Sequence, residues 1–261
     1  MEFDFKDIIY EKKDSVARIT INRPHVRNAV TDDTMFEMIK AFHDAADDKT
    51  IGAVVLTGAG DKAFCAGGDI NWEKNKGFPD IWDHYIDIHN AMRNCLKPII
   101  ARVNGYAIGW GNHVAYYCDL TIAAEHAIFG QNGPRVGSPA GGYIVSYLVR
   151  VVGAKKAREM WYLCRRYTAK EALEMGLANA VVPMEKLDEE VDKWCQEILS
   201  MSPTCLRVLK ATFESEFDYM RHDPLSYQRM YSPDYFKTGE SLEGQNAFLE
   251  KRKPDFSKFR R

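Results

Sequence analysis

The stretch PIIARVNGYAIGWGNH, residues 98–113, decides how the rest of the chain is arranged. It opens with an apolar, β-branched run that predicts a buried strand. Gly105, Gly109 and Gly111 then predict a turn, and the apolar residues 114–118 continue as a helix. A glycine-rich turn between a strand and a helix leaves backbone N–H groups free at the helix start, where they can face a bound group.

A second segment repeats this arrangement. AFCAGGDI, residues 63–70, follows the apolar strand candidate at residues 53–56. Taken alone, each turn is equally well an ordinary tight connection, because glycine is the default residue for such geometry. Two such turns brought together would place two N–H donors around one oxygen, which is an oxyanion hole. The pair therefore predicts a site that stabilises negative charge on a substrate oxygen.

The composition favours one globular unit and excludes several classes of function. The chain has 261 residues, of which 46% are hydrophobic, and a formal net charge of -2, which suits a sizeable core. Because it has no basic stripe and no apolar run of membrane-spanning length, nucleic acid and membranes are not expected partners. The six cysteines lack CxxC spacing, which predicts reduced thiols in a cytoplasmic protein and no metal site. Cys65 lies in a glycine turn, but no partner histidine is evident for a nucleophile.

The order of predicted elements is an α/β core followed by helices. A hairpin over residues 7–21 leads to a helix that begins at Thr31, and strands and helices alternate up to about residue 142. Residues 71–80 are polar and without periodicity, which predicts a loop that could act as a lid. We expect a core over residues 1–200 and a helical C-terminal region over residues 201–261.

Three segments taken together resemble one enzyme family. AFCAGGDI, KPIIARVNGYAIGWGN and CDLTIAAEHAIFGQ are similar to the enoyl-CoA hydratase/isomerase (crotonase) superfamily, and the resemblance runs from about Ile9 to the C-terminus. It implies a crotonase-like α/β spiral of ββα units with a helical C-terminal trimerisation region. It also implies an acyl-CoA substrate and a homotrimer or a homohexamer built as a dimer of trimers.

The resemblance assigns residues to the oxyanion hole and to CoA. The oxyanion donors would be the backbone N–H groups of Gly68 and Trp110; the second position is usually glycine in the family, so Trp110 is a departure. Arg27 would lie near the CoA phosphates, Ala66 near the adenine, and Lys251 would reach CoA from an adjacent subunit. From the residues alone, Arg27 could equally be a surface cap and Lys251 part of a solvated charge cluster.

Within the superfamily, the hydratases use two glutamates whose positions here hold His113 and Gly133. The paired carboxylates that hydration needs for acid/base work are therefore absent. FGQNGPRVGS, GAKKAREMWYLC and KRKPDF resemble instead the branch with 1,4-dihydroxy-2-naphthoyl-CoA synthase and 2-ketocyclohexanecarboxyl-CoA hydrolase. In that branch, residues matching Gln131 and Trp161 hold bicarbonate in the space beside the Gly133 position. The resemblance thus implies a pocket for an anion or water, with CoA entering only as part of the substrate and no tightly bound cofactor.

Two departures from that branch leave the acid/base group open. Ala140 and Phe236 stand where the branch has a catalytic Asp and a catalytic Tyr, and neither can transfer a proton. The candidates to fill the gap are Ser138, His113, Tyr235, Asp83, His84 and Tyr143.

We expect hydrolytic ring opening of a cyclic β-keto acyl-CoA, as in the degradation of alicyclic or aromatic acids. Ring closure of the synthase type, hydration of a cyclic enoyl-CoA and a non-enzymic acyl-CoA binder remain as alternatives.

Overall fold

Two sheets form the body of the protein in this computed structural model, which describes residues 3–76, 83–215 and 230–259. The larger sheet has the strand order β1-β2-β3-β5-β7-β10. All its neighbours run parallel except the β1–β2 hairpin. Its strands are β1 (Ile8–Lys13), β2 (Val16–Ile21), β3 (Ala53–Gly58), β5 (Ile99–Val103), β7 (Leu120–Ala124) and β10 (Ala180–Val182).

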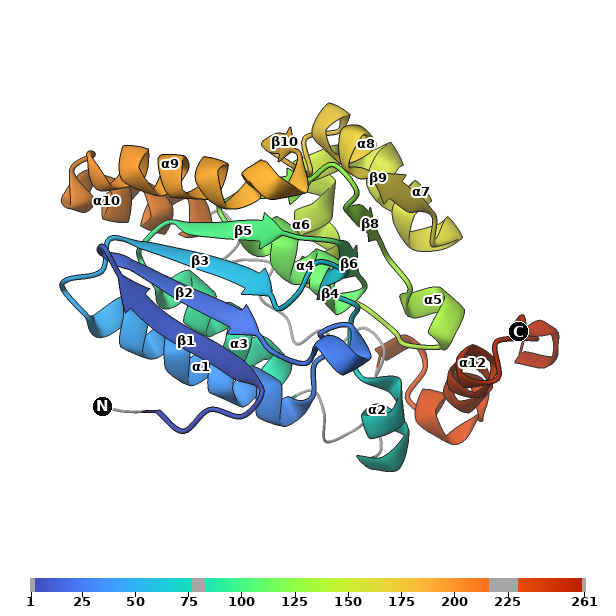
Figure 1. The fold of residues 1–261 in the computed structure, drawn as a ribbon. Helices are drawn as coiled ribbons and strands as arrows, with labels where there is room; N and C mark the ends of the chain where they lie inside the picture. The colour runs from blue at the N-terminus through green and yellow to red at the C-terminus, as the bar shows by residue number, and fades with distance from the viewer. Residues whose placement is uncertain (1–2, 77–82, 216–229, 260–261) are drawn as a thin grey trace.

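A second sheet of short strands lies beside the first, in the order β4-β6-β8-β9 (Figure 1). Its strands are β4 (Ala63–Cys65), β6 (Tyr106–Ile108), β8 (Ile128–Gly130) and β9 (Arg166–Thr168). Along the chain, β4, β6 and β8 each follow one long strand of the first sheet and precede a helix. This repetition is the expected spiral of ββα units, so the predicted α/β fold class is confirmed.

Helices cover both faces of the larger sheet. Figure 1 shows α1 and α3 on one face and α9 on the other, while α12 lies apart, next to α2 and α5. The helices are α1 (Asp32–Asp47), α2 (Ile70–Lys76), α3 (Asp83–Asn94), α4 (Trp110–Tyr117), α5 (Gly133–Val136), α6 (Tyr143–Val152), α7 (Ala154–Leu163), α8 (Ala169–Glu174), α9 (Leu187–Leu199), α10 (Pro203–Ser215) and α12 (Glu240–Leu249).

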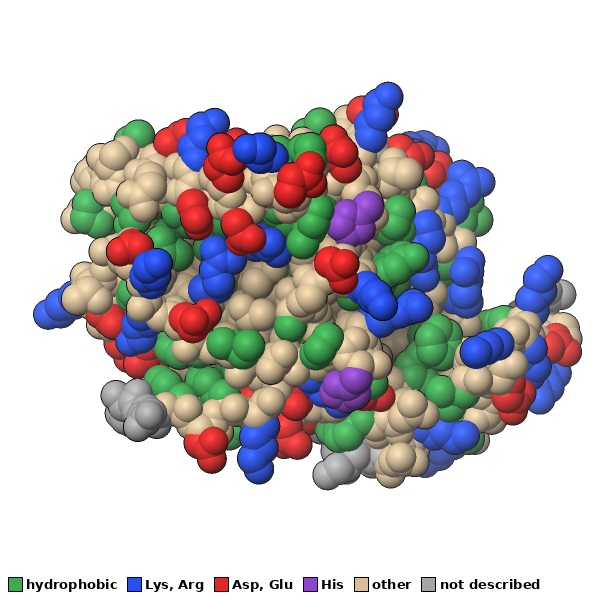
Figure 2. Space-filling view, in the orientation of Figure 1, with side chains coloured by type: hydrophobic (Ala, Val, Ile, Leu, Met, Phe, Trp, Pro, Cys, Tyr) green, Lys and Arg blue, Asp and Glu red, His purple; other side chains and the backbone are tan. Residues whose placement is uncertain are grey.

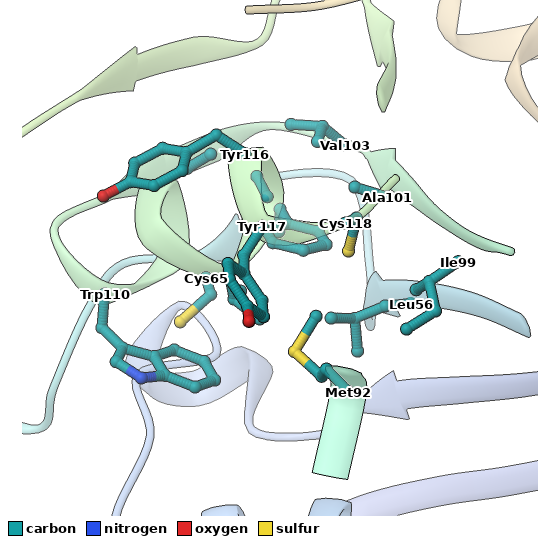
Figure 3. Close-up of a cluster of buried hydrophobic side chains, with 14 of the residues drawn as sticks. Leu56, Cys65, Met92, Ile99, Ala101, Val103, Trp110, Tyr116, Tyr117 and Cys118 are labelled. Carbon is teal, nitrogen blue, oxygen red and sulfur yellow. The ribbon is translucent and has the colours of Figure 1, made fainter. Parts of the chain in front are cut away.

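Burial follows the apolar pattern of the sequence. Helix α1 begins at the predicted Thr31, whose hydroxyl accepts from the Thr34 N–H in a capping box. Its apolar stripe packs on the sheet in the main core, and a smaller core lies between the other face and α9. In Figure 3, Leu56 and Ile99 from the long strands lie near Tyr117, the last residue of α4, and Cys118 just after it. The core therefore holds α4, the helix of the glycine turn, against the central strands.

The prediction of a loop over residues 71–80 is wrong for residues 71–76. Helix α2 spans Ile70–Lys76, and the Asp69 carboxylate accepts from the Trp72 N–H at 3.3 Å near its start. An aspartate before the first helical residue stabilises the start of a helix. The polar residues of α2 have no apolar period that would predict this helix. The remaining residues of the expected lid, 77–80, lie outside the described residues.

Replacing Phe42 by alanine is expected to lower the free energy of unfolding by about 3–5 kcal/mol, because the lost ring leaves a cavity. Phe42 on α1 is fully buried, whereas Phe36 on the same helix is 45% exposed. Phe36→Ala is the matched control and is expected to change the free energy by about 0.5 kcal/mol. Urea denaturation at one protein concentration measures both, and equal losses would contradict this packing.

Candidate active site

The two glycine turns lie side by side because β4 and β6 pair in parallel. A Cβ at Gly111 would lie 2.0 Å from the Cys65 carbonyl oxygen, and a Cβ at Gly109 would lie 3.9 Å from the Gly67 Cα. Gly67 and Gly109 also have φ of 109° and 58°, which L side chains rarely adopt. The glycines are thus required by a close approach of two backbones.

Two backbone N–H groups are left over where these turns meet. Val30 pairs with the Gly67 carbonyl and the Asp69 N–H, which leaves the Gly68 N–H without an acceptor among the described residues. Trp110 is the first residue of α4, after Gly109, and its N–H likewise donates to no described group. Both residues line one cavity of about 560 Å³. The structure thus brings together the two expected donors, whose catalytic role remains a prediction.

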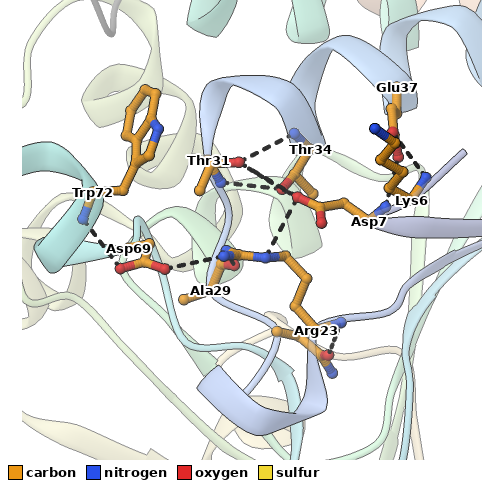
Figure 4. A network of polar contacts seen from close by, with 10 residues as sticks. Lys6, Asp7, Arg23, Ala29, Thr31, Thr34, Glu37, Asp69 and Trp72 are labelled. Carbon is orange, nitrogen blue, oxygen red and sulfur yellow. Dashed lines mark hydrogen bonds and ion pairs between the residues drawn. The ribbon is translucent and has the colours of Figure 1, made fainter. Parts of the chain in front are cut away.

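A half-buried arginine, Arg23, holds the Gly68 turn in place (Figure 4). Arg23, just after β2, forms ion pairs with Asp69 at 3.2 Å and with Asp7 at 3.4 Å, and it donates to the Ala29 carbonyl. The Arg23 and Asp69 side chains are only 14% and 12% exposed, so these contacts are little screened by water. The network ties the start of α2 to the end of β2 and thereby positions the turn.

The mouth of the cavity carries the residues expected near CoA. Arg27 and Ala66 both line it, and the Ala66 N–H donates to the Arg27 carbonyl at 3.1 Å. The Arg27 guanidinium lies 5.6 Å from the centre of the Tyr106 ring. Figure 2 shows a hollow on this face beside the C-terminal helical segment, with basic and histidine side chains near its rim. Lys251 is exposed and does not line the cavity of its own chain.

The inner wall of the cavity is polar and buried. The His113 Nε2 lies 3.0 Å from the Gln131 Oε1, and the His113 and Trp161 rings are 5.3 Å apart. Gln131 Nε2 and Trp161 Nε1 are buried without a hydrogen-bond partner among the described residues. A Cβ at Gly133 would lie 2.7 Å from the Ser138 carbonyl oxygen, so a side chain does not fit there. The three residues of the expected anion or water pocket therefore meet in one wall.

The His113 imidazole is held neutral by its surroundings. Burial, together with the nearby His89, lowers its pKa to about 3, although the contact with Gln131 opposes the shift. A neutral imidazole can hold or orient a polar group but carries no positive charge at neutral pH.

The other acid/base candidates are placed differently. Ser138 lines the cavity, and its hydroxyl has no hydrogen bond to a described residue. Tyr235 does not line it: its hydroxyl donates to the Gly137 carbonyl at 2.7 Å, and burial raises the pKa of that phenol. The side chains of Asp83, His84 and Tyr143 lie outside the described residues.

The sequence pattern did not reveal Glu73 as a cavity residue. Glu73 lines the same cavity from α2, and burial, with the nearby Asp69 charge, raises the pKa of its carboxyl to about 7. The segment looked like a loop, and only a helical assignment would have placed Asp69 and Glu73 one turn apart on one face. The spacing of these two acids was the one available signal.

Cys65 is buried in the first glycine turn. Burial raises the pKa of the Cys65 thiol to about 12, and its sulfur accepts from the Gly67 N–H at 3.4 Å. A protonated thiol is a poor nucleophile. The role of Cys65 is therefore structural: its sulfur accepts the hydrogen bond from Gly67 and stabilises the turn. Among the described residues no cluster of His, Cys, Asp and Glu could hold a metal ion. No helix in the same part of the chain is long and apolar enough to cross a bilayer.

The sequence model of the enoyl-CoA hydratase/isomerase family matches residues 11–259. The chain belongs to this family. An enoyl-CoA hydratase from Mycobacterium avium subsp. paratuberculosis is similar, with a TM-score of 0.85, 27% identity and coverage of 96% of this chain and 98% of that one. A Geobacillus kaustophilus protein named as an enoyl-CoA hydratase subunit has a TM-score of 0.77, 32% identity and coverage of 97% and 99%. The expected superfamily is thereby confirmed, and this enoyl-CoA hydratase/isomerase family member is an acyl-CoA-processing enzyme.

The free energy of unfolding is expected to fall as the pH drops below about 6.5. In the unfolded chain the His113 imidazole then binds a proton, whereas in the folded protein the buried imidazole stays neutral. The loss from this group is up to about 1.4 kcal/mol per pH unit between 6.5 and the folded value near 3. His113→Gln should flatten the pH dependence of the free energy of unfolding, whereas His43→Gln, at an exposed site on α1, should not. Urea denaturation from pH 5 to 8 measures both slopes, and parallel curves for His113→Gln and the unaltered protein would refute the neutral burial.

Proposed function

We propose that this enzyme opens the ring of a cyclic β-keto acyl-CoA by hydrolysing a carbon–carbon bond. The observation that carries this proposal is the pair of free N–H groups at Gly68 and Trp110, which face one cavity with a basic mouth. Such a pair matches a thioester oxygen that becomes an enolate oxyanion, and losing one donor of this kind typically costs about 3–4 kcal/mol of transition-state stabilisation. His113 and Gly133, in place of two carboxylates, argue against simple enoyl-CoA hydration.

The reaction would pass through the thioester enolate. Water adds to the ring ketone, the bond between that carbon and the α-carbon breaks, and its electron pair moves onto the thioester oxygen between the two N–H groups. The former ketone becomes a carboxylic acid. A proton returns to the α-carbon, so that the product is an open-chain dicarboxylic acid with one CoA ester. Helix α4 directs its N-terminus at the same oxygen and adds to its stabilisation.

A small polar ligand beside the acyl group fits the inner wall. The unpartnered donors Gln131 Nε2 and Trp161 Nε1 would hold the attacking water or a small anion such as bicarbonate, because buried donors without acceptors are costly. Gly133 keeps side-chain bulk away from that place.

Ring closure of the 1,4-dihydroxy-2-naphthoyl-CoA synthase type is the second candidate, because the same two donors would suit a bicarbonate base. Ala140 and Phe236 count against it, since neither side chain transfers a proton. A non-enzymic binder would have no use for two N–H groups aimed at a developing oxyanion.

The C-terminal region supports an oligomer. Large apolar side chains of α10 and the following described segment are exposed in the single chain, among them Leu209, Phe213 and Tyr231. Such patches mark association surfaces. A homotrimer, or a hexamer of two trimers, would cover them and bring Lys251 toward a neighbouring site.

Incubation with 2-ketocyclohexanecarboxyl-CoA is expected to yield the open-chain mono-CoA ester with a mass increase of one water. Mass spectrometry of parallel incubations with o-succinylbenzoyl-CoA tests ring closure, which would lose one water, and cyclic enoyl-CoA substrates test hydration. If the enzyme converts o-succinylbenzoyl-CoA or a cyclic enoyl-CoA but not 2-ketocyclohexanecarboxyl-CoA, ring opening is refuted, and ring closure or hydration replaces it. Failure to bind any CoA thioester in calorimetry would end the acyl-CoA assignment.

Arg27→Ala is expected to weaken CoA binding by about tenfold, or about 1.4 kcal/mol, because a phosphate loses a charged donor. Arg158→Ala, at an exposed position on α7 away from the cavity lining, is the matched control and should bind as the unaltered protein does. Calorimetric titration with CoA measures both, and equal affinities in all three proteins would remove Arg27 from the site.

A further inference from the structure

Glu73 lies beside the glycine turn that carries the Gly68 N–H, called the oxyanion turn below. It projects from α2 into the wall of the cavity, where its Oε1 would lie 1.9 Å from a methyl group placed on Gly68. Gly68 carries one of the two free N–H groups, so the carboxyl lies next to the place where the thioester carbonyl is expected. The α-carbon of an acyl-CoA is bonded directly to that carbonyl. A carboxyl at this place is therefore within reach of the α-carbon.

The Glu73 carboxyl is not engaged elsewhere. The side chain is partly buried and has no hydrogen bond or ion pair to a described residue. Asp69, the other carboxylate that lines the cavity, is held by Arg23 at 3.2 Å and caps α2. An unpaired carboxyl in a partly dehydrated wall is costly for structure alone, and such groups cluster at functional sites.

The other candidates for proton transfer are engaged or unsuited. His113 is neutral and contacts Gln131, and the Tyr235 hydroxyl donates to a backbone carbonyl. Ala140, at the position of the expected aspartate, has no ionisable group. Among the described residues that line the cavity, Glu73 is the one carboxyl free to act.

We propose that Glu73 is the catalytic acid/base that exchanges a proton with the α-carbon of the bound thioester. This inference rests on the proposed enolate chemistry. In the forward direction, the Glu73 carboxylic acid gives its proton to the α-carbon, and the electron pair of the enolate forms the new C–H bond. In the reverse direction, the carboxylate takes an α-proton and the electron pair moves onto the oxygen between Gly68 and Trp110. No other reactant is needed.

The charges around Glu73 suit both directions. Burial raises the pKa of its carboxyl to about 7, and the Asp69 charge acts in the same sense, so both protonation states are populated at neutral pH. Besides Asp69, the other ionisable groups of the cavity are His25, Arg27, Tyr106, His113 and Arg166. Helix α12 packs against α2: Lys74 on α2 donates to Asn246 on α12 at 2.8 Å, and Glu243 on α12 is paired with Arg252.

The test is α-proton exchange in D₂O with pimeloyl-CoA, the open-chain mono-CoA ester, followed by NMR and mass spectrometry. The unaltered enzyme should wash deuterium into the α-position, with a rate that rises through an apparent pKa near 7. Glu73→Gln should lower the rate at least about 100-fold, remove that pH dependence, and bind pimeloyl-CoA within about twofold of the unaltered Kd. Glu125→Gln, at an exposed turn between β7 and β8, is the matched control and should exchange normally.

Each outcome decides the matter. Exchange by Glu73→Gln at the unaltered rate overturns the role of Glu73 and leaves the proposed ring opening standing. If the unaltered enzyme binds pimeloyl-CoA but exchanges nothing between pH 6 and 9, the role of Glu73 is also refuted. If the unaltered enzyme neither binds pimeloyl-CoA nor exchanges it, the proposed function falls with it. The thermal midpoint of Glu73→Gln, together with its Kd, separates lost chemistry from lost folding.

Discussion

The close approach of two backbones, β4 with its turn and β6 with its turn, is the constraint on which the site depends. The Cys65 carbonyl occupies the space that a side chain at Gly111 would need, so only a hydrogen atom fits between α4 and β4. This contact sets the start of α4 beside Gly68. Two N–H groups then lack acceptors within the described chain, and a bound oxygen is their natural partner. Residues with larger side chains at these glycine positions would push the two turns apart, so the Gly68 and Trp110 N–H groups would no longer lie near one oxygen.

Around that pair the cavity is graded in charge. Arg27 stands at the mouth, the neutral wall of His113, Gln131 and Trp161 lies inside, and Glu73 is next to the oxyanion turn. A buried positive imidazole would compete with the helix N-terminus for the developing charge, and dehydration prevents it. The Arg23 network fixes Asp69 as a structural anion and leaves Glu73 unpaired. The division of labour between two nearby acids thus follows from which one has a cationic partner.

Much of the fold was predictable from local pattern. The hairpin, α1 with its Thr31 cap, the central strand β5 and helices α6 to α9 follow the apolar period of their own residues. The three-residue strands β4, β6 and β9 were not, because so short a run carries no period, and β6 lies inside what read as one turn. Helix α2 was missed because its polar residues are stabilised by the Asp69 cap and by packing against α12.

The sequence by itself determined the α/β fold and marked the two glycine turns, because apolar periods and glycine clusters are visible within single segments. It also marked Arg27, Ala66, Gln131 and Trp161 through the family motifs. Only the tertiary structure decided that Glu73 lies against Gly68 and that Tyr235 bonds to a backbone carbonyl. Those facts depend on segments far apart in the chain meeting in space, and on which buried polar groups find a partner there. No period or spacing within one segment encodes them.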